Sequence, residues 1–363
     1  MNSFHGKLAL QQRVLPNYRA PFFDLLASAC DGGMSLFTGL PGPAEGIATT
    51  NQLQVANYHL GQNIHLLGGS LYLCYQRGLI DWLENWDPDA LIVEANARYL
   101  STPSAVTWMH HRKRPVIGWG LGTSPRSGFR NRRRLSFINQ FDAMIAYSQR
   151  GAQEYAALGF PRERIFVAHN SVSRAPTSLP DHKPMTVDRL NILFVGRLQA
   201  RKRIDNLLKA CAQLESQPRL VIVGEGPERQ SLEALARGVY PSAEFIGAKH
   251  GAELKPYFTE ADLFVLPGTG GLAVQEAMSY GLPVIVAQGD GTQDDLVRKE
   301  NGWQIPPPTG NFEALLSTMK DALSDIARLR RMGEESYRIV KEEINIEKMV
   351  ETFVGVLNRL TGK

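Results

Sequence analysis

Two basic residues follow a short apolar segment in the middle of the chain, at a spacing suited to phosphate binding. In "NILFVGRLQARK" the apolar run ends at Gly196, and Arg197 and Lys202 follow before an amphipathic segment begins. Glycine at the end of a strand lets a ligand approach the main chain closely. An arginine and a lysine five residues apart can hold a diphosphate from two sides. Other basic residues surround this pair, so an ordinary basic surface is the alternative.

A glycine-rich turn and a short helix form a second candidate for anion binding. The stretch "LPGTGGLAVQEAMSYGLPVI" predicts a strand end, a turn, a helix and another strand. The N–H groups of Gly270, Gly271 and Leu272 would be free at the start of this helix, where the helix dipole favours an anion. Glu276 lies on the same face as Leu272 and could accept hydrogen bonds from a ribose diol. A surface glutamate on a structural helix is the alternative.

Two further strand ends in the second half could contribute to the same site. In "AEFIGA" the apolar side chain of Ile246 and the main chain at Gly247 could hold a flat nucleobase. In "LVIVGEGPER" two glycines resemble part of a dinucleotide-binding fingerprint, but the third glycine is absent. A tight turn with proline at the first helical position is therefore favoured there.

The first half of the chain offers weaker candidates, for which structural hydrogen bonding is the alternative. Tyr18 and Arg19 follow the first predicted strand, while Glu94 and Asn96 lie at the carboxyl end of the strand "ALIVEA". A cluster of arginines could attract anionic lipid head groups or a phosphate-bearing acceptor, and a solvated helix face is its alternative. The cluster consists of Arg126, Arg130, Arg132, Arg133 and Arg134.

The sequence gives little reason to expect a metal site or a disulfide. Asp87 and Asp89 imitate a metal-binding Asp-x-Asp motif, but they precede a strand, whereas ligands bind beyond the carboxyl ends of parallel strands. We therefore expect a helix-to-strand turn there and no required metal or cofactor. Three widely separated cysteines indicate buried thiols in a reducing compartment.

Short β-branched runs alternate with longer amphipathic segments throughout the chain, which is typical of α/β proteins with parallel sheets. Each run ends near glycine, asparagine or proline, as buried parallel strands usually do. The predicted strands are 7–14, 34–39, 64–69, 90–95, 115–120, 143–148 and 164–170 in the first half, and 191–197, 220–226, 243–248, 263–268, 283–289 and 302–307 in the second.

The length of 363 residues favours two domains. A proline-containing segment without helical or alternating periodicity predicts the boundary between them. We expect one doubly wound, Rossmann-like domain over residues 1–173, a linker over 174–188 and a second such domain over 189–345. Residues 346–363 would form a terminal helix that packs back on the first domain.

Composition excludes several classes of protein. Apolar residues make up 43% and charged residues 21% of the chain, as in ordinary globular domains, and the net charge is only +4. No run of eighteen apolar residues and no secretion signal is present. The arginines are not accompanied by a nucleic-acid-binding motif, so nucleic acid is not an expected partner. We expect a cytoplasmic protein that the arginines could attach peripherally to the inner face of a membrane.

Taken together, the motifs of the second half resemble those of a known enzyme family. Their order and spacing over residues 190–308 are similar to those in retaining glycosyltransferases of the GT-B fold, family four type, which build bacterial cell-surface glycans and glycolipids. The motifs are "VGRL", "VIVGEGPE", "FIG", "ADLFVLPG", "GGLAVQEAMSYGLPVI", "GDGTQDDLV" and "NGWQIPP". In the first half, "DAMIAYSQRGAQEYAALGFPRERIFVAHNSV" and "RVLPNYRAPFFDLL" also resemble segments of that family.

The resemblance implies a role for each candidate residue. Arg197 and Lys202 would hold the diphosphate of a UDP- or GDP-sugar, and Glu276 would contact the ribose. The main chain near Gly196 and around Ile246 and Gly247 would contact the nucleotide. The glycine-rich turn would contact the distal phosphate and sugar through Gly268, Thr269, Gly270, Gly271 and Leu272. On the acceptor side the candidates are Tyr18, Arg19, Glu94, Asn96, Gly120 and Leu121.

The chain departs from the family pattern at two positions. The family usually has a second glutamate eight residues before Glu276, where this chain has Gly268, and often a histidine where this chain has Leu121. Gly268 either makes room for a differently shaped sugar or marks a site that no longer turns over. The sequence therefore predicts a metal-independent hexosyltransferase acting on a cell-surface glycan or lipid-linked saccharide. The alternative is a non-catalytic nucleotide-sugar-binding, glycan-binding or partner protein with the same fold.

Overall fold

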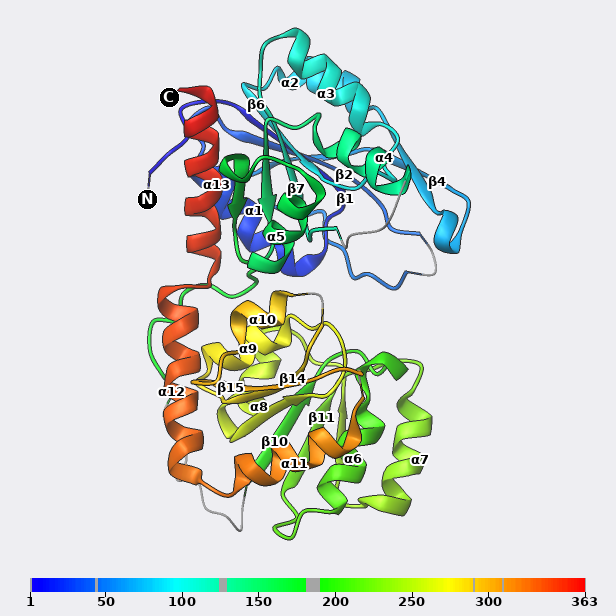
Figure 1. Ribbon diagram of the computed structural model, residues 1–363, viewed down its shortest axis with the longest axis vertical. Coiled ribbons are helices and arrows are strands. Elements are labelled where there is room, and N and C mark those ends of the chain that lie inside the picture. The colour runs from blue at the N-terminus through cyan, green and yellow to red at the C-terminus, as the bar shows by residue number, and fades with distance from the viewer. Residues whose placement is uncertain are drawn as a thin grey trace. The chain divides into compact units, whose positions relative to one another are not determined.

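The structure, a computed structural model, describes residues 2–42, 45–123, 129–180, 190–289, 291–308 and 310–362 (Figure 1). The side chains of Ser70, Phe129 and Arg130 are also outside the description. The chain forms two compact units. Unit 1 combines Met1–Val172 with Ile346–Lys363, and unit 2 is Ser173–Asn345.

Unit 1 is built on a seven-stranded sheet of order β3-β2-β1-β6-β7-β8-β9, in which all neighbouring strands are parallel. Its strands are β1 (Leu8–Val14), β2 (Met34–Gly39), β3 (Asn57–Leu60), β6 (Ala90–Glu94), β7 (Val116–Gly120), β8 (Ala143–Ala146) and β9 (Ile165–Val167). Its helices are α1 (Ala20–Ser28), α2 (Leu79–Trp86), α3 (Thr102–His111), α4 (Phe129–Ile138), α5 (Gln149–Leu158) and α13 (Ile346–Thr361), with 3-10 turns η1 (Asn17–Arg19), η2 (Gly69–Leu71) and η3 (Arg162–Arg164).

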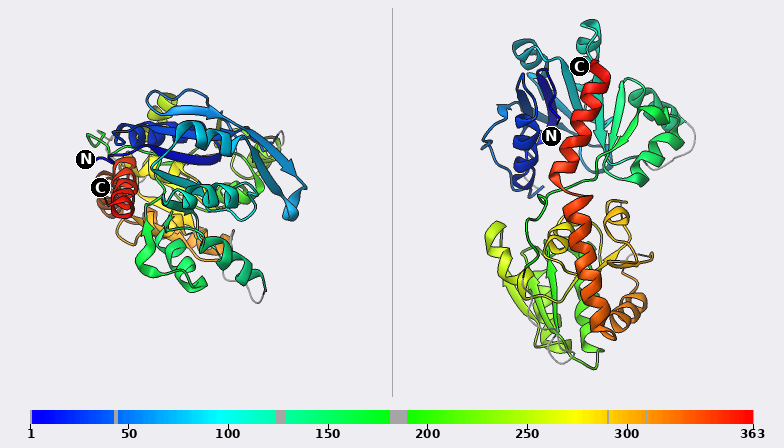
Figure 2. Two further views of the ribbon diagram at one scale, coloured as in Figure 1. Left: turned by 90° about the horizontal axis from the view of Figure 1, so that it is seen from above. Right: turned by 90° about the vertical axis from the view of Figure 1, so that its left-hand side faces the viewer.

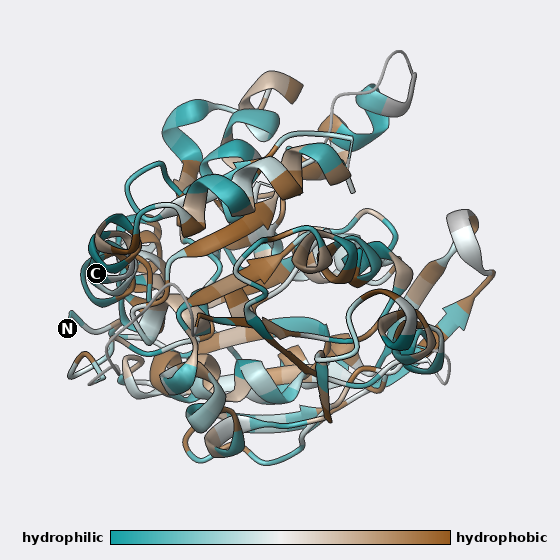
Figure 3. Ribbon diagram, turned by 90° about the horizontal axis from the view of Figure 1, so that it is seen from below, coloured by the Kyte–Doolittle hydropathy of each residue, from teal (hydrophilic) through white to brown (hydrophobic). Residues whose placement is uncertain are grey.

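Helices cover both faces of this sheet, which explains why its strands are apolar throughout. Successive residues of β1 enter two separate cores: Leu8 and Leu10 pack with Phe22 of α1 and Phe353 of α13, whereas Ala9 packs with residues of α2 and α3. Strand side chains alternate between the two faces of a sheet, so both faces are buried. Figure 3 shows the strands as mainly hydrophobic ribbons.

One predicted strand was assigned wrongly. The segment 64–69 was expected among the parallel strands, but β4 (Gln62–Leu66) pairs antiparallel with β5 (Leu73–Arg77) in a separate hairpin. Exposed and half-exposed side chains predominate on β4, so it is not a buried central strand.

Unit 2 has a six-stranded parallel sheet of order β12-β11-β10-β13-β14-β15. Its strands are β10 (Asn191–Val195), β11 (Arg219–Val223), β12 (Glu244–Gly247), β13 (Leu263–Leu266), β14 (Val284–Ala287) and β15 (Gly302–Ile305). Its helices are α6 (Ile204–Ala212), α7 (Arg229–Val239), α8 (Lys255–Glu260), α9 (Ala273–Ser279), α10 (Thr292–Leu296), α11 (Phe312–Leu323) and α12 (Ile326–Glu342), with 3-10 turns η5 (Ala200–Lys202) and η6 (Gly251–Leu254).

Both sheets follow the doubly wound order, in which the direction of winding reverses between two neighbouring strands. The reversal lies between β1 and β6 in unit 1 and between β10 and β13 in unit 2. Ligands of such sheets bind beyond the carboxyl ends of the strands at this switch point. The loops that follow β6, β10 and β13 are therefore the first places to search for a site.

Helix α13 (Ile346–Thr361) follows unit 2 in sequence but packs in unit 1 (Figure 2). The Phe353 ring contacts those of Phe22 and Trp119, with ring centroids 5.1 Å apart in each pair. No helix in the described part of the chain has the length and apolar character required to cross a bilayer.

Candidate functional site

In unit 2 the loops after β10 and β13 meet through a lysine. Lys202, at the end of η5, is only 5% exposed, and its Nζ donates to the carbonyl oxygen of Thr269 at 2.9 Å and to that of Gly270. Burying an ammonium group is costly unless it is hydrogen-bonded. The main-chain carbonyls of the glycine-rich turn satisfy that requirement. The structure thus brings together Lys202 and the turn that the sequence singled out separately.

Gly268 is required by main-chain packing within this arrangement. A Cβ atom at Gly268 would lie 2.1 Å from the carbonyl oxygen of Arg201 and 2.4 Å from the Cα of Lys202. The next residue, Thr269, donates its N–H to the same Arg201 oxygen at 3.1 Å. The side on which a Gly268 side chain would project is therefore filled by the backbone of η5 and is not open space for a sugar.

The turn after Thr269 leads into α9, which carries Glu276. Gly270 has a φ of +67°, in the left-handed region that favours glycine. The N–H groups of Gly270, Gly271 and Leu272 donate no hydrogen bond to other described residues. Glu276 is half-buried, and burial raises the pKa of its carboxyl above the ordinary range. Within the described residues this carboxyl has no hydrogen-bonding partner, so it can accept a hydrogen bond from a hydroxyl group of a ligand.

The remaining donor-side candidates lie on neighbouring strand ends of the same sheet. Gly196 follows β10 and donates its N–H to the Val223 carbonyl at 3.0 Å, while Arg197 is exposed on the loop that leads to η5. Gly247 ends β12 and accepts from the Gly224 N–H at 2.8 Å; Ile246 precedes it and is half-buried. The strand order β12-β11-β10-β13 places these loops in sequence along one edge of the sheet.

The two glycines of "GEG" have structural roles. A Cβ at Gly224 would lie 1.9 Å from the Gly196 carbonyl oxygen, and one at Gly226 would lie 2.2 Å from the Leu198 carbonyl oxygen. They allow the loops after β10 and β11 to touch, in keeping with the tight turn predicted from the sequence.

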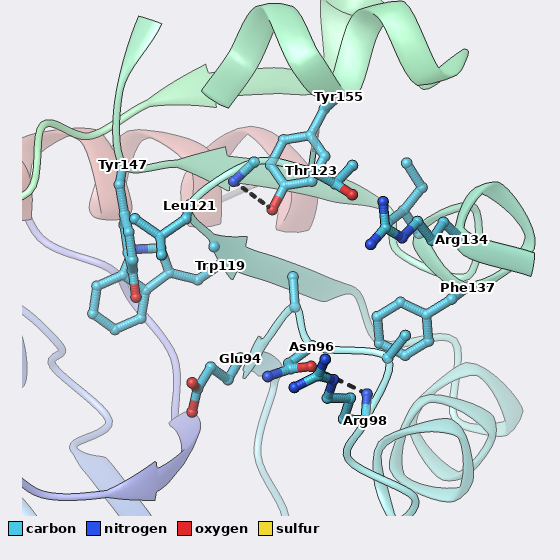
Figure 4. Close-up of a pocket in the computed structure, with 15 residues that line it drawn as sticks. Glu94, Asn96, Arg98, Trp119, Leu121, Thr123, Arg134, Phe137, Tyr147 and Tyr155 are labelled. Carbon is cyan, nitrogen blue, oxygen red and sulfur yellow. Dashed lines mark hydrogen bonds between the residues drawn. The ribbon is translucent and has the colours of Figure 1, made fainter. Parts of the chain in front are cut away.

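Unit 1 contains a pocket of about 380 Å³ at the carboxyl ends of β6 and β7 (Figure 4). Its size is within the range of small-molecule sites. Glu94, Asn96, Gly120 and Leu121, four of the acceptor-side candidates, line this pocket. The other lining residues are Ala95, Ala97, Arg98, Trp119, Gly122, Thr123, Arg134, Phe137, Ile138, Tyr147 and Tyr155.

Glu94 is held in place by two hydrogen bonds. Its Oε2 accepts from the Arg13 N–H at 2.9 Å, and its Oε1 accepts from the Tyr99 hydroxyl at 3.1 Å. Burial raises the pKa of the Glu94 carboxyl, although both hydrogen bonds lower it. The result is a fixed carboxyl group at one end of the pocket, as Figure 4 shows.

Close glycine contacts shape the opposite wall. A Cβ at Gly120 would lie 2.5 Å from the Tyr155 hydroxyl oxygen, and one at Gly151 would lie 2.3 Å from the Leu121 carbonyl oxygen. The Tyr155 hydroxyl accepts from the Gly122 N–H at 3.1 Å. These contacts fix the loop after β7 against the start of α5 and leave the Leu121 side chain 47% exposed.

Tyr18 and Arg19 do not line the pocket. Tyr18 is 47% exposed, whereas Arg19 is 6% exposed and lies over the rings of Trp119 and Tyr147, at 5.4 and 5.8 Å from their centroids. Arg19 also donates to the Asn170 side chain. Its direct partners are therefore protein groups, and it supports two aromatic residues of the pocket from behind.

Sequence reasoning did not identify the aromatic part of the pocket. Trp119, Phe137, Tyr147 and Tyr155 come from four different segments, and only the fold brings them together. The one available signal was the position of Trp119 near the carboxyl end of β7.

The other sequence candidates have structural partners or lie outside the description. Asp87 ends α2 and pairs with Arg114, and an Asp89 oxygen accepts from the Lys7 N–H at 2.8 Å. The described residues contain no group of three side chains arranged to hold a metal ion. Arg126 and the side chain of Arg130 are outside the described residues, Arg132 and Arg133 are exposed on α4, and Arg134 lines the pocket.

Comparison with protein families matches one model to this chain. Residues 181–339 match the model "Glycosyl transferases group 1". The matched segment contains every donor-side candidate, all of which lie in unit 2.

Curated relatives extend the similarity into the first half of the chain. A GDP-mannose-dependent alpha-mannosyltransferase of Mycobacterium tuberculosis is 29% identical over 276 residues, which cover 69% of this chain and 67% of the relative. The lipopolysaccharide core biosynthesis glycosyltransferase LpsE of Rhizobium meliloti is 22% identical, over 84% of this chain and 99% of its own.

Solved structures match both units together. HepE of Anabaena, in a crystal structure with UDP, superposes with a TM-score of 0.72 and 17% identity, covering 99% of this chain and 100% of that one. This degree of likeness establishes the fold: two parallel α/β sheets in the GT-B arrangement of elements along the chain.

Proposed function

Because the chain belongs to the group 1 glycosyltransferases and has the GT-B fold, we propose that it is a retaining hexosyltransferase that uses a nucleoside-diphosphate sugar. The acceptor would be a hydroxyl of a cell-surface glycan or a lipid-linked saccharide. The observation that carries this proposal is the buried contact between Lys202 and the glycine-rich turn beside Glu276. It combines a cation, free main-chain N–H groups and a hydrogen-bond-accepting carboxyl at one switch point.

The donor would bind across the strand ends of unit 2. Arg197 and Lys202 would hold the diphosphate, and Glu276 would accept a hydrogen bond from a ribose hydroxyl. Lys202 would exchange a carbonyl of the turn for a phosphate oxygen, a charge-assisted and therefore stronger bond. The main chain at Ile246 and Gly247 would contact the base. The nucleotide sugars named for similar proteins, GDP-mannose for one and UDP-glucose for another, support a UDP- or GDP-sugar.

The distal phosphate and the sugar would lie at the turn before α9. Gly268 and Thr269 are fixed against η5, and the N–H groups of Gly270, Gly271 and Leu272 are available to oxygens of the ligand. Main-chain N–H groups fixed before the ligand arrives stabilise negative charge without further reorganisation.

The transfer step requires stabilisation of the leaving diphosphate above all. The bond between the anomeric carbon and the diphosphate oxygen breaks, the acceptor oxygen bonds to the same face of that carbon, and the acceptor proton passes to the leaving phosphate oxygen. Arg197, Lys202 and the turn N–H groups would stabilise the charge that develops on the diphosphate. These side chains supply the positive charge for this step, so we propose that no metal ion is required.

The acceptor would enter the pocket of unit 1. Glu94, Asn96 and the main chain at Gly120 and Leu121 offer hydrogen-bonding groups to sugar hydroxyls. The exposed Arg132 and Arg133 of α4 would allow contact with anionic lipids, which would bring a membrane-bound acceptor near this unit.

A non-catalytic glycan- or nucleotide-sugar-binding protein is the second candidate. Its motivation is the presence of Gly268 and Leu121 where the family usually has glutamate and histidine. Such a protein would keep its donor affinity and lose turnover.

One set of assays tests the proposal and separates the two candidates. Release of UDP or GDP is measured with a panel of nucleotide sugars and saccharide acceptors, and donor binding is measured by thermal shift. We expect donor-dependent release in the wild type and a loss of about 10²–10³-fold in Lys202→Ala, the cost of removing one charge-stabilising group. Glu276→Ala should weaken donor binding. Donor binding without release would favour the binding protein, and unchanged turnover in both variants would refute the site assignment.

A further inference from the structure

The pocket of unit 1 has two arginines among its lining residues. Arg98 follows β6 in the chain and Arg134 belongs to α4, so two separate segments each contribute one guanidinium group. Figure 4 shows both side chains directed into the space between the two segments. The Arg98 guanidinium has no hydrogen-bond or ion-pair partner among the described residues. The bonds of this residue are made by its main chain, whose N–H donates to Asn96 Oδ1 at 3.1 Å and whose carbonyl accepts from the Cys74 N–H at 2.9 Å.

The single carboxylate of the described lining, that of Glu94, is bonded to groups other than the two lining arginines. Glu94 directs one oxygen to the Arg13 N–H and the other to the Tyr99 hydroxyl. No ion pair joins Glu94 to either lining arginine within the described residues. The nearby acid Glu45 already pairs with the Arg13 guanidinium at 2.8 Å. The described lining therefore carries more positive than negative charge.

The rest of the lining suits a sugar ring. Trp119 and Phe137 are buried residues whose rings border the pocket, and Tyr147 packs edge-on against Trp119 with centroids 5.1 Å apart. Aromatic rings offer apolar surface to the C–H faces of a sugar, while Asn96 and exposed main-chain groups offer hydrogen bonds to its hydroxyls. The pocket thus combines a saccharide surface with two cations.

We propose that the acceptor is a saccharide carrying a negatively charged oxyacid group, phosphate or carboxylate, which Arg98 and Arg134 bind. This inference rests on the proposed function, because it specifies the acceptor of that reaction. A guanidinium group has the planar donor geometry that matches two oxygens of a carboxylate or phosphate. Two such groups from different segments would also fix the direction in which the saccharide enters the pocket.

Direct binding measurements test the charge preference. Isothermal titration calorimetry compares glucose 6-phosphate, glucuronic acid and glucose, at low and at high salt, in the absence of donor. We expect the wild type to bind at least one anionic probe about tenfold or more tightly than glucose, since a hydrogen bond to a charged group is stronger than one between neutral groups. High salt should reduce the difference. The preferred anionic probe would distinguish a phosphate from a carboxylate acceptor.

Variants show whether the preference belongs to this pocket. Arg98→Ala and Arg134→Ala should each lose the preference, whereas Arg132→Ala, which removes an exposed arginine from the same helix α4, should retain it. Thermal unfolding checks that all three variants are folded. Equal binding of glucose and the anionic probes would overturn the inference, as would a preference that survives in both pocket variants.

The donor assay keeps this result separate from the proposed function. Thermal shift with UDP- and GDP-sugars reports on unit 2, and Arg98→Ala should bind the donor as the wild type does. Absence of donor binding in the wild type would count against the proposed function. Normal donor binding together with no anionic preference would count against this inference alone.

Discussion

On the donor side, Gly268 shows that tight packing of the main chain can determine which residue type a position accepts. At Gly268 a Cβ atom would meet the backbone of η5 at 2.1 and 2.4 Å. Backbone atoms cannot move aside as the end of a flexible side chain can. The glycine therefore determines how close the loops after β10 and β13 approach each other, and with that closeness the position of Lys202.

Gly268→Ala should consequently disrupt unit 2. We expect a loss of about 1–3 kcal/mol in the free energy of unfolding, typical of overpacking, together with weaker donor binding. Gly268→Glu, which introduces the residue usual in the family, should be at least as harmful. Gly238→Ala is the matched control: a Cβ there meets nothing within 4 Å, and alanine favours the helix α7. Chemical denaturation measures all three, and an unperturbed Gly268→Ala would contradict this account.

Glu276 should make stability depend on pH. Its folded-state pKa is raised above the ordinary value of 4.5 by burial. The stability that it contributes is thus fully present below pH 4.5 and is lost as the pH rises through the folded-state pKa. Glu276→Gln cannot ionise, so its unfolding temperature relative to that of the wild type should increase over this interval.

The measurement is thermal unfolding of both proteins from about pH 4 to about pH 8. Carboxyl groups with raised pKa values titrate within this range. A constant difference between the two curves would show that Glu276 does not titrate with a raised pKa.

The sequence allowed these residues to be nominated but did not show how they are combined. Arg197, Lys202 and Glu276 were found from strand ends and helix starts, which local patterns reveal. The bonds from Lys202 to the glycine-rich turn join residues 67 and 68 positions apart, and no local pattern encodes them. The aromatic lining around Trp119 was missed for the same reason.

Among the elements, α9 connects the donor side to the two ends of unit 2. Gln275, next to Glu276, is 1% exposed. Its Nε2 donates to the Ile344 carbonyl at 2.7 Å, and its Oε1 accepts from the Ser173 N–H at 3.3 Å. Ser173 is the first residue of unit 2 and Ile344 lies one residue before the last. The Gln275 side chain thus forms hydrogen bonds both with the first residue of this unit and with a residue next to its last.

Replacing Gln275 by alanine should destabilise unit 2. The Ile344 carbonyl would lose its partner, and an unsatisfied buried polar group costs about 1–3 kcal/mol. Gln230→Ala, at an exposed position of α7, should have almost no effect. Urea denaturation compares the two, and equal stability would mean that the two hydrogen bonds of Gln275 contribute nothing net.

Elements differed in how well local sequence predicted them. Buried parallel strands such as β10 and β13 were recognised because both faces are apolar and a glycine or proline follows. The β4–β5 hairpin was missed because the apolar residues near β4 indicated a buried parallel strand and β5 was not predicted at all. The antiparallel pairing depends on the turn around η2, which connects the two strands. The residue pattern of one strand does not show that the chain turns back there.

For the molecule as a whole, the main feature is that unit 1 is made from two separated parts of the chain. Phe353 of α13 is fully buried and joins Phe22 and Trp119 in one aromatic cluster. Trp119 also lines the proposed acceptor pocket. The integrity of that pocket therefore depends on a helix that is more than two hundred residues away in sequence.

Phe353→Ala should destabilise unit 1 by about 3–5 kcal/mol, the usual cost of removing a buried phenylalanine. Glu351→Ala, at an exposed position of the same helix, should cost little. Tryptophan fluorescence reports mainly on unit 1, which contains Trp82, Trp86, Trp108 and Trp119, whereas unit 2 contains Trp303. Binding of UDP or GDP follows unit 2. A Phe353→Ala protein whose fluorescence transition does not shift would contradict the assigned packing.

The position of α13 also has a consequence for the order of events during protein synthesis. Residues 346–363 are translated only after all of unit 2 has been made. Unit 2 is continuous, so it can complete its core while the aromatic cluster of unit 1 still lacks Phe353. The apolar surface that α13 later covers stays open to solvent for the time needed to translate unit 2. We expect nascent chains stopped before residue 346 to be bound by chaperones through unit 1, and chains that include α13 to be released.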